Sequence, residues 1–205
     1  MRSLRDNRLG AAGVAALAPA LAANGALTAL DLSSNYLKDE GVSAVCEAIQ
    51  SNKETKLASL NFRQNNIGPV GANALAAMVA VTGVLTALDL SINELKNAGV
   101  SAVCEAIQSN KETKLASLNM RRTNFGPVGA KSVAVMVTVT GSLTECNVCG
   151  NNLDSESAKK LAMIGTEKGI MLFGMKRDQK EATLPASTSK QQTPSSFRRT
   201  LSQAG

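Results

Sequence analysis

The residues with the most reactive side chains in this sequence are four cysteines, and two of them have a suggestive spacing. Cys146 and Cys149 form the C-x-x-C pattern found in redox and zinc sites. Histidine is absent, which removes the commonest general base and the commonest metal ligand. The sequence also lacks a glycine-rich phosphate loop, a nucleophile paired with a base, and a recognisable pair of catalytic carboxylates. It therefore predicts neither an enzyme nor a cofactor or metal site.

The surroundings of the cysteines favour four free thiols. Cys146 and Cys149 lie in an expected strand, where three residues span about 10 Å and the two side chains point to opposite faces. A disulfide needs α-carbons within roughly 7 Å of each other. Cys46 and Cys104 occupy equivalent helical positions in two repeats, at least about 9 Å apart, and are explained as small core residues.

The elements that position these residues belong to an internal repeat. The segment GVSAVCEAIQSNKETKLASLN occupies residues 41–61 and recurs unchanged at 99–119. Within each unit runs the pattern L-x-x-L-x-L-x-x-N-x-L, which is the signature of a leucine-rich repeat. A helical spacing of apolar residues follows it, so each unit reads as strand, turn, helix and return. The first leucines of the units are Leu27, Leu57, Leu85, Leu115 and Leu143.

The alternation of 30- and 28-residue steps and the G-x-x-A-V-x-x-A-I helix resemble the ribonuclease-inhibitor class of leucine-rich repeats. That class includes the activator of the Ran GTPase and the repeat regions of nucleotide-binding immune receptors, and the resemblance covers residues 3 to about 165. It implies an α/β solenoid, a horseshoe segment with a parallel sheet on the concave side and helices on the convex side. It also implies a protein-protein interaction module or scaffold.

The composition divides the chain into two parts. We expect a repeat domain over 1–175 with about six units, the first truncated and the last degenerate, because Cys146 and Val148 replace leucines there. Residues 176–205 are rich in Ser and Thr and predict a disordered basic tail. The alanine-rich run from Leu9 to Ala23 is explained by the repeat register rather than by a secretion signal, which favours a cytoplasmic location.

Charge and hydropathy narrow the choice of partners. Six of the 22 basic residues and two of the 16 acidic residues lie in 176–205, so the body carries 16 basic and 14 acidic residues. A nearly neutral body predicts no nucleic-acid binding, and no stretch is apolar for long enough to span a bilayer. The first unit shows no dedicated cap, which predicts stacking or self-association at the N-terminal end.

Three sets of repeated positions have expected structural roles. Asp39, Asn97 and Ser155 stand where they would cap the helix that follows each of them, and Pro69 and Pro127 suit a first helical position. Gly25, Gly83 and Gly141 would allow left-handed helix ends. An asparagine ladder, in which side chains satisfy backbone groups between units, is expected at Asn7, Asn35, Asn65, Asn93, Thr123 and Asn151.

The residues between the strand leucines should point to the concave, solvent side. They form three rows across the sheet and contain no Trp, Tyr or Phe. One row includes Ser33, Arg63, Ser91 and Arg121, and the next includes Gln64, Ile92 and Arg122. Because guanidinium groups grip carboxylates in bidentate fashion, these rows predict a protein partner with an acidic segment. The candidate contact residues are Arg63, Asp89, Arg121, Arg122, Asp31, Asn61 and Asn119.

Three alternatives stay open at this point. Similarity to the Ran activator suggests a regulator of a small GTPase, although that family carries an acidic tail and this tail is basic. The chain also reads as a fragment of a larger repeat-containing receptor. Finally, the concave face can be interpreted as a polar solvated surface without a dedicated partner.

Overall fold

The computed structural model describes residues 2–173; the predicted boundary at residue 175 and the tail at 176–205 lie outside them. Strands and helices alternate strictly along the chain. The strands are β1 (Arg2–Ser3), β2 (Ala29–Asp31), β3 (Ser59–Asn61), β4 (Ala87–Asp89), β5 (Ser117–Asn119) and β6 (Glu145–Asn147). The helices are α1 (Gly10–Ala23), α2 (Lys38–Ser51), α3 (Pro69–Val81), α4 (Lys96–Ser109), α5 (Pro127–Val139) and α6 (Ser155–Lys168).

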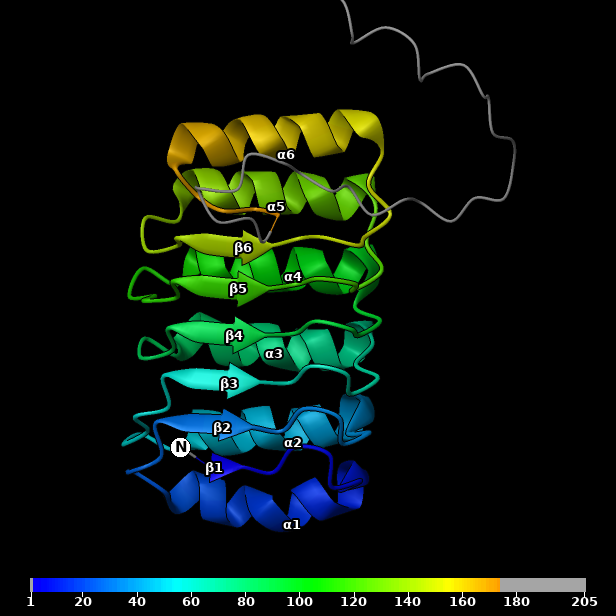
Figure 1. The fold of residues 1–205 in the computed structure, drawn as a ribbon. Coiled ribbons are helices and arrows are strands. Elements are labelled where there is room, and N and C mark those ends of the chain that lie inside the picture. The colour runs from blue at the N-terminus through cyan, green and yellow to red at the C-terminus, as the bar shows by residue number, and fades with distance from the viewer. Residues whose placement is uncertain (1, 174–205) are drawn as a thin grey trace, which may run out of the picture.

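The strands form one six-stranded parallel sheet in chain order, β1 to β6. The register places Leu30 opposite Leu60, Leu60 opposite Leu88, and Leu88 opposite Leu118, so the repeat leucines form a continuous row. The sheet makes one layer and the stacked helices make the other (Figure 1). The predicted α/β leucine-rich repeat solenoid is therefore confirmed.

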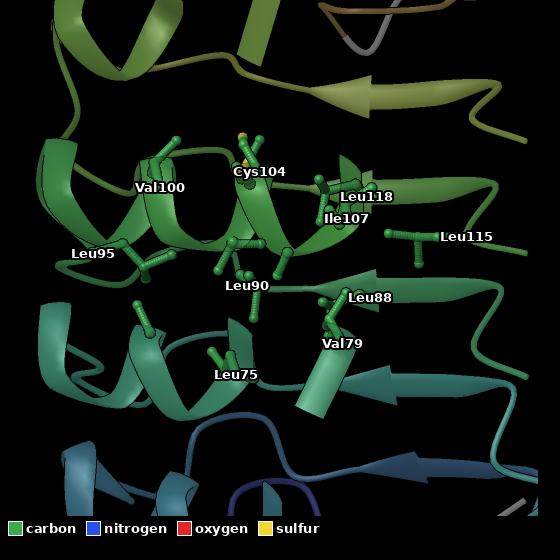
Figure 2. Close-up of a cluster of buried hydrophobic side chains, with 14 of the residues drawn as sticks. Leu75, Val79, Leu88, Leu90, Leu95, Val100, Cys104, Ile107, Leu115 and Leu118 are labelled. Carbon is green, nitrogen blue, oxygen red and sulfur yellow. The ribbon is translucent and has the colours of Figure 1, made fainter. Parts of the chain in front are cut away.

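The hydrophobic core lies between these two layers and is built from equivalent positions of successive units. Leu88 and Leu90 from the β4 unit meet Val100 and Cys104 of α4 and Leu75 of α3 (Figure 2). Each of these side chains is at most 2% exposed. Burying one such aliphatic side chain is worth about 1.5–3 kcal/mol, so every unit is stabilised by the neighbours on both sides.

The asparagine ladder is present, and Asn65 shows its pattern. The Nδ2 of Asn65 donates to the carbonyl oxygen of Phe62 at 3.1 Å and to that of Leu32, in the preceding unit, at 2.9 Å. Its Oδ1 accepts from the backbone N–H of Asn35 at 3.0 Å. Each amide therefore satisfies its own turn and that of the preceding unit, which confirms the predicted structural role.

Thr123 maintains only part of the ladder. Its hydroxyl donates to the carbonyl oxygen of Met120 at 2.8 Å, and its N–H donates to Oδ1 of Asn151 at 2.8 Å. Threonine has no amide oxygen to offer the preceding unit. The N–H of Asn93 instead donates to the carbonyl oxygen of Arg122 at 3.2 Å.

The helix starts differ from the sequence prediction. The long-unit helices α2 and α4 begin at Lys38 and Lys96 without a side-chain cap. Asp39 and Asn97 act on the next unit, where Asp39 Oδ1 accepts from Gly68 N at 2.6 Å and Asn97 Oδ1 accepts from Gly126 N at 2.8 Å. Stacking brings successive helix N-termini side by side, so a short polar side chain reaches the neighbouring helix.

Two further predictions concern the residues at which helices begin. In the sixth unit the capping residue is Asp154 rather than Ser155, because its carboxylate accepts from Ser157 N at 2.8 Å. Pro69 and Pro127 do begin α3 and α5, as predicted.

The predicted left-handed glycine stops are wrong. Among residues 2–173 the glycines with positive φ are Gly10, Gly150 and Gly169, and the short-unit helices end instead at extended Asn24, Thr82 and Thr140. An extended residue leads directly into the return loop, so Gly25, Gly83 and Gly141 are not needed for a left-handed turn. At Gly83 the close neighbour is the next loop, because a Cβ there would lie 3.3 Å from the Glu112 carbonyl oxygen.

The sheet ends differently at its two edges. At the C-terminal edge the N–H groups of Cys146 and Val148 donate to the carbonyl oxygens of Met171 and Leu172 at 2.8 and 2.9 Å. Leu172 is buried against the core. At the N-terminal edge β1 is two residues long and exposed. The two ends of the stack are therefore not equivalent.

Candidate binding surface on the sheet

Four of the predicted contact residues form one row across the sheet. Asp31, Asn61, Asp89 and Asn119 are the last residues of β2 to β5, and each lies opposite the next in the parallel register. All four are partly exposed. The strand pairing thus brings together side chains that are about 30 residues apart in the sequence, as the repeat period predicts.

This row organises the turn that follows each strand. Asp89 Oδ1 accepts from Ser91 N at 2.8 Å, and Asn61 and Asn119 accept in the same way from the N–H groups of Arg63 and Arg121, at 2.9 and 3.1 Å. This is an Asx turn, a side-chain bond to the backbone two residues on. Sequence reasoning missed it, although the alternation of Asp and Asn at strand ends was a visible signal.

Asp89 is further tied into the sheet by its second carboxylate oxygen. Its Oδ2 accepts from Nδ2 of Asn119 at 3.1 Å. Both oxygens of Asp89 are therefore engaged within the protein, which leaves the neighbouring arginines as the groups with the most unused hydrogen-bonding capacity.

The second row contains Arg63 and Arg121, two units apart and both partly buried. Strands of neighbouring units lie about 4.8 Å apart, so these two side chains leave the sheet roughly 10 Å from one another. The hydrogen bonds that they make within residues 2–173 come from backbone groups, such as Arg121 N to Asn119 Oδ1 at 3.1 Å. The solvent-facing position expected of their guanidinium groups stays a prediction.

The serines of the same row are buried, which corrects the expectation that the whole row faces solvent. Ser33 is 2% exposed and Ser91 is 0% exposed. A serine side chain is short, and a longer residue stands on each side of it at the strand spacing. Among residues 2–173 the Oγ of Ser91 has no hydrogen-bond partner, so a polar atom lies unpaired between Arg63 and Arg121.

The third row has a backbone conformation that sequence reasoning did not predict. Gln64, Ile92 and Arg122 have φ angles of 56°, 56° and 51°, and Gly150 continues the row at 71°. A Cβ added to Gly150 would lie 2.8 Å from Cγ of Arg122. The stem of Arg122 therefore lies across Gly150, and glycine leaves the space that it occupies.

The C-x-x-C pair confirms the prediction of free thiols. Cys146 points into the core and is fully buried, whereas Cys149 is partly exposed on the sheet face, and all four cysteines are unpaired. Burial raises the pKa of the Cys146 thiol to about 12. Partial burial also raises the pKa of Cys149, and the nearby Arg121 acts in the opposite direction. Neither thiol is a ready nucleophile at neutral pH.

Within 2–173 no three His, Cys, Asp or Glu side chains gather closely enough to hold a metal ion. None of the described helices is long and apolar enough to cross a bilayer. The rows of Asx turns and arginines are therefore the candidate binding feature of the sheet face.

The fold, the repeat leucines and the ladder together define the class: the chain is a leucine-rich repeat protein of the ribonuclease-inhibitor-like type. The family model described as "Leucine Rich repeat" matches residues 26–46, 53–76 and 84–104. The matches thus cover the strand, the turn and the first part of the helix in three successive repeats, from β2 to α4.

Known proteins with similar sequences carry the same repeat. Human NACHT, LRR and PYD domains-containing protein 13 is 32% identical over 145 residues, which is 71% of this chain and 14% of that protein. The bovine NACHT, LRR and PYD domains-containing protein 9 is 30% identical over 163 residues, 78% of this chain and 16% of that protein. The mouse ribonuclease inhibitor is 30% identical over 143 residues, 70% of this chain and 31% of that protein. The chain therefore spans less than a third of the length of each of these relatives.

A solved structure shows the same architecture at lower sequence identity. The structure of the Leiomodin-1 actin-binding site 2 matches with a TM-score of 0.59 and 17% identity, over 76% of this chain and 85% of that one. At this identity the similarity shows the fold alone. The class comprises binding repeats, and the partner of any one member depends on the residues of its own surface.

Proposed function

We propose that the sheet face binds an acidic segment of another protein, with Arg63, Arg121 and Arg122 as the contact residues. The observation that carries this proposal is the placement of Arg63 and Arg121 in one row of the sheet face, two units apart, with the short, buried Ser91 between them. A carboxylate that approaches this row from the solvent side can meet a guanidinium group on each side.

The sheet also pre-organises the arginines, which lowers the entropy lost on binding. Asx turns hold the backbone of Arg63 and Arg121, and the stem of Arg122 lies across Gly150. Asp31, Asn61, Asp89 and Asn119 support the surface by making those turns and by lining the floor beside them. In this proposal the protein is a binding module, without catalysis of its own.

The test uses a fluorescent peptide of alternating Glu and Ser, titrated with the full chain at low salt. The double variant Arg121→Glu/Arg122→Glu should lose binding by about tenfold or more, since each reversal replaces an attraction by a repulsion. The matched control is Lys53→Glu/Lys111→Glu, which makes the same change in net charge at equivalent loop positions. Equal losses in the two double variants would show a general charge effect and would refute the proposed surface.

A second candidate function is self-association through the N-terminal end of the stack. A cavity of about 280 Å³ opens there, lined by Leu4, Val14, Leu17, Leu21, Leu27 and Leu30. The C-terminal edge of the sheet is already paired with residues 171–172, so we expect a second copy to meet this end through its own N-terminal face. A contact of that kind is two-fold symmetric and closes after two copies.

Sedimentation over a range of concentrations tests this dimer. The wild-type chain should associate, and Leu17→Lys should shift it to monomer, because a charge in the apolar cavity is costly. Ala16→Lys, on the exposed side of α1, is the matched control. A wild-type chain that is monomeric at every concentration contradicts the dimer.

The other alternative from the sequence, a regulator of a small GTPase, stays a prediction. Its direct test is the rate of GTP hydrolysis by a panel of small GTPases with and without the chain. The cytoplasmic location also stays a prediction, and the four free thiols support it, because such thiols persist in reducing compartments.

A further inference from the structure

The outer surface of the helix layer is uneven, and α3 presents an uncharged side there. No charged residue occurs between Asn65 and Leu88, so α3 carries none at all. Its core side is made by residues such as Leu75 and Met78, which are fully buried. The opposite side is a stripe of exposed residues at helical spacing, here named the α3 stripe: Val70, Asn73, Ala77, Ala80 and Val81.

Packing within the solenoid does not account for this stripe. Val70 and Val81 are 67% and 69% exposed, although the core side of the same helix already supplies the contacts with the sheet. A helix that is apolar on all sides is normally buried on all sides. Exposed apolar patches bordered by polar residues are typical of binding surfaces.

The neighbouring helices show that the repeat does not require such a surface. Counting from the repeat glycines Gly71, Gly41 and Gly99, the position of Ala77 in α3 corresponds to Glu47 in α2 and Glu105 in α4. Both glutamates are exposed. Because α2, α3 and α4 lie next to one another in the stack, an acidic side chain flanks the α3 stripe on each side (Figure 1).

A difference between the two nearly identical long units extends the apolar surface in one direction. Glu40 of the first long unit is replaced by Ala98 in the second. Ala98 corresponds to Val70 of α3 and to Val128 of α5, and all three are exposed. The second long unit differs from the first at three further positions, and at this one it lacks a charge beside α3, where that charge would interrupt an apolar row.

We propose that the α3 stripe binds an amphipathic helix of a partner protein, one whose apolar side is flanked by Lys or Arg. Such a helix places its apolar residues on Ala77 and the two valines, and its basic flanks face Glu47 and Glu105. This surface is on the helix layer and is separate from the sheet face, so the chain has two binding surfaces with opposite charge preferences.

The same glutamates argue against other occupants. Two copies of this chain that met through their α3 stripes would bring Glu47 and Glu105 of one copy close to those of the other, which is unfavourable. An anionic lipid surface is disfavoured for the same reason. The stripe on α5 is less suited to a basic helix, because Lys131 lies within it and Lys159 and Lys160 are exposed on the adjacent α6.

The test uses a labelled helical peptide of about 18 residues, with Leu and Ala on one side and Lys flanking them, titrated with the full chain. The variant Ala77→Arg should weaken binding by about tenfold or more, because it places a bulky cation in the centre of the stripe. Val135→Arg makes the same new side chain at the equivalent position of α5 and should leave the affinity unchanged. Both variants should retain the wild-type melting temperature, since both positions are exposed.

The charge preference is tested by exchange. The double variant Glu47→Lys/Glu105→Lys should lose the Lys-flanked peptide and gain binding of a peptide of the same design with Glu flanks. Arg121→Glu/Arg122→Glu should leave both affinities unchanged, which separates this proposal from the one for the sheet face. Equal effects of Ala77→Arg and Val135→Arg, or equal binding of both peptides by the wild type, would overturn the proposal. So would dimerisation or binding to anionic phospholipid vesicles that Ala77→Arg abolishes.

Discussion

The third and fifth strands of the sheet are followed by turns of the same length, yet the two turns are stabilised differently. After β3 the turn contains Asn65, whose amide bonds both its own unit and the preceding one. After β5 the equivalent residue is Thr123, whose hydroxyl bonds Met120 in its own turn and, at 3.4 Å, Asn151 of the next unit, but within residues 2–173 has no bond to the preceding unit. The ladder is complete in the first region and interrupted in the second.

The interruption coincides with the candidate binding surface. Arg121 and Arg122 immediately precede Thr123, and the carbonyl oxygen of Arg122 accepts the N–H that an asparagine side chain accepts elsewhere. The same turn is where Arg122 extends over Gly150. The regular positions of the repeat thus build the solenoid, and two of the three arginines proposed to bind a partner, Arg121 and Arg122, lie where the repeat departs from its pattern.

The largest expected effect comes from breaking the complete part of the ladder. The side chain of Asn93 makes five hydrogen bonds, in which Oδ1 accepts from Asn65 N and Ile67 N and Nδ2 donates to three carbonyl oxygens. Asn93→Ala leaves several buried backbone groups unpaired and should lower the free energy of unfolding by about 3 kcal/mol, measured by urea denaturation.

Asn124→Ala is the matched control for that change. Asn124 lies one position outside the ladder and is exposed, and its side chain bonds the side chains of Glu94 and Asn152 at 2.7 and 2.6 Å. Its loss should cost less than about 1 kcal/mol, because water replaces the lost partners. A cost equal to that of Asn93→Ala would contradict the structural role assigned to the ladder.

The sequence was sufficient to predict the features that recur in every repeat unit. The leucine row, the ladder and the alternation of strand and helix follow from spacing, since each unit buries the same positions against its neighbours. Bonds that cross between units at the helix starts could not be predicted, because Asp39 and Asn97 have the same local pattern whether they cap their own helix or the next. The burial of Ser91 likewise depends on what stands beside it in adjacent units.

The second prediction compares the cysteine environments at alkaline pH. Burial holds the folded-state pKa of Cys146 at about 12, above the ordinary value of 9.0, so the folded state favours the protonated thiol. This stability is present below pH 9 and is lost as the pH rises toward 12. At pH 10 the unfolded chain should gain about 1 kcal/mol from ionising this one thiol.

The measurement is the free energy of unfolding at pH 7 and pH 10, for the wild type and for Cys146→Val. The variant should lose about 1 kcal/mol less than the wild type between pH 7 and pH 10, whatever its stability at pH 7. Cys149→Val should change this pH dependence of the unfolding free energy less, because Cys149 is only partly buried. An identical pH dependence in wild type and Cys146→Val would contradict the shifted pKa.

The third prediction concerns the interrupted part of the ladder. Thr123→Val keeps the shape of the side chain and removes the hydroxyl that donates to the Met120 carbonyl at 2.8 Å. One buried hydrogen bond is lost, so the cost should be about 1 kcal/mol, well below that of Asn93→Ala. Thr144→Val removes a similar bond, to the carbonyl of Ala116, at an exposed position and should cost less. If Thr123→Val cost as much as Asn93→Ala, Thr123 would stabilise its turn as strongly as a ladder asparagine does, and the ladder would not be weakened there.

The smallest expected effect is the difference in stability between losing one and losing the other of the two side-chain caps that bond the next unit. Asp39 accepts one bond from Gly68 N, whereas Asn97 accepts two, from Gly126 N and Gly129 N. A charged acceptor forms a stronger bond than a neutral one, and it also interacts favourably with the positive end of α3. Asp39→Ala and Asn97→Ala should therefore each cost about 1 kcal/mol at low salt, with a difference below about 0.5 kcal/mol. In 1 M NaCl the cost of Asp39→Ala should fall while that of Asn97→Ala stays the same, because salt screens only the charged cap. If salt changed both costs equally, the caps would not differ in the way their chemistry requires.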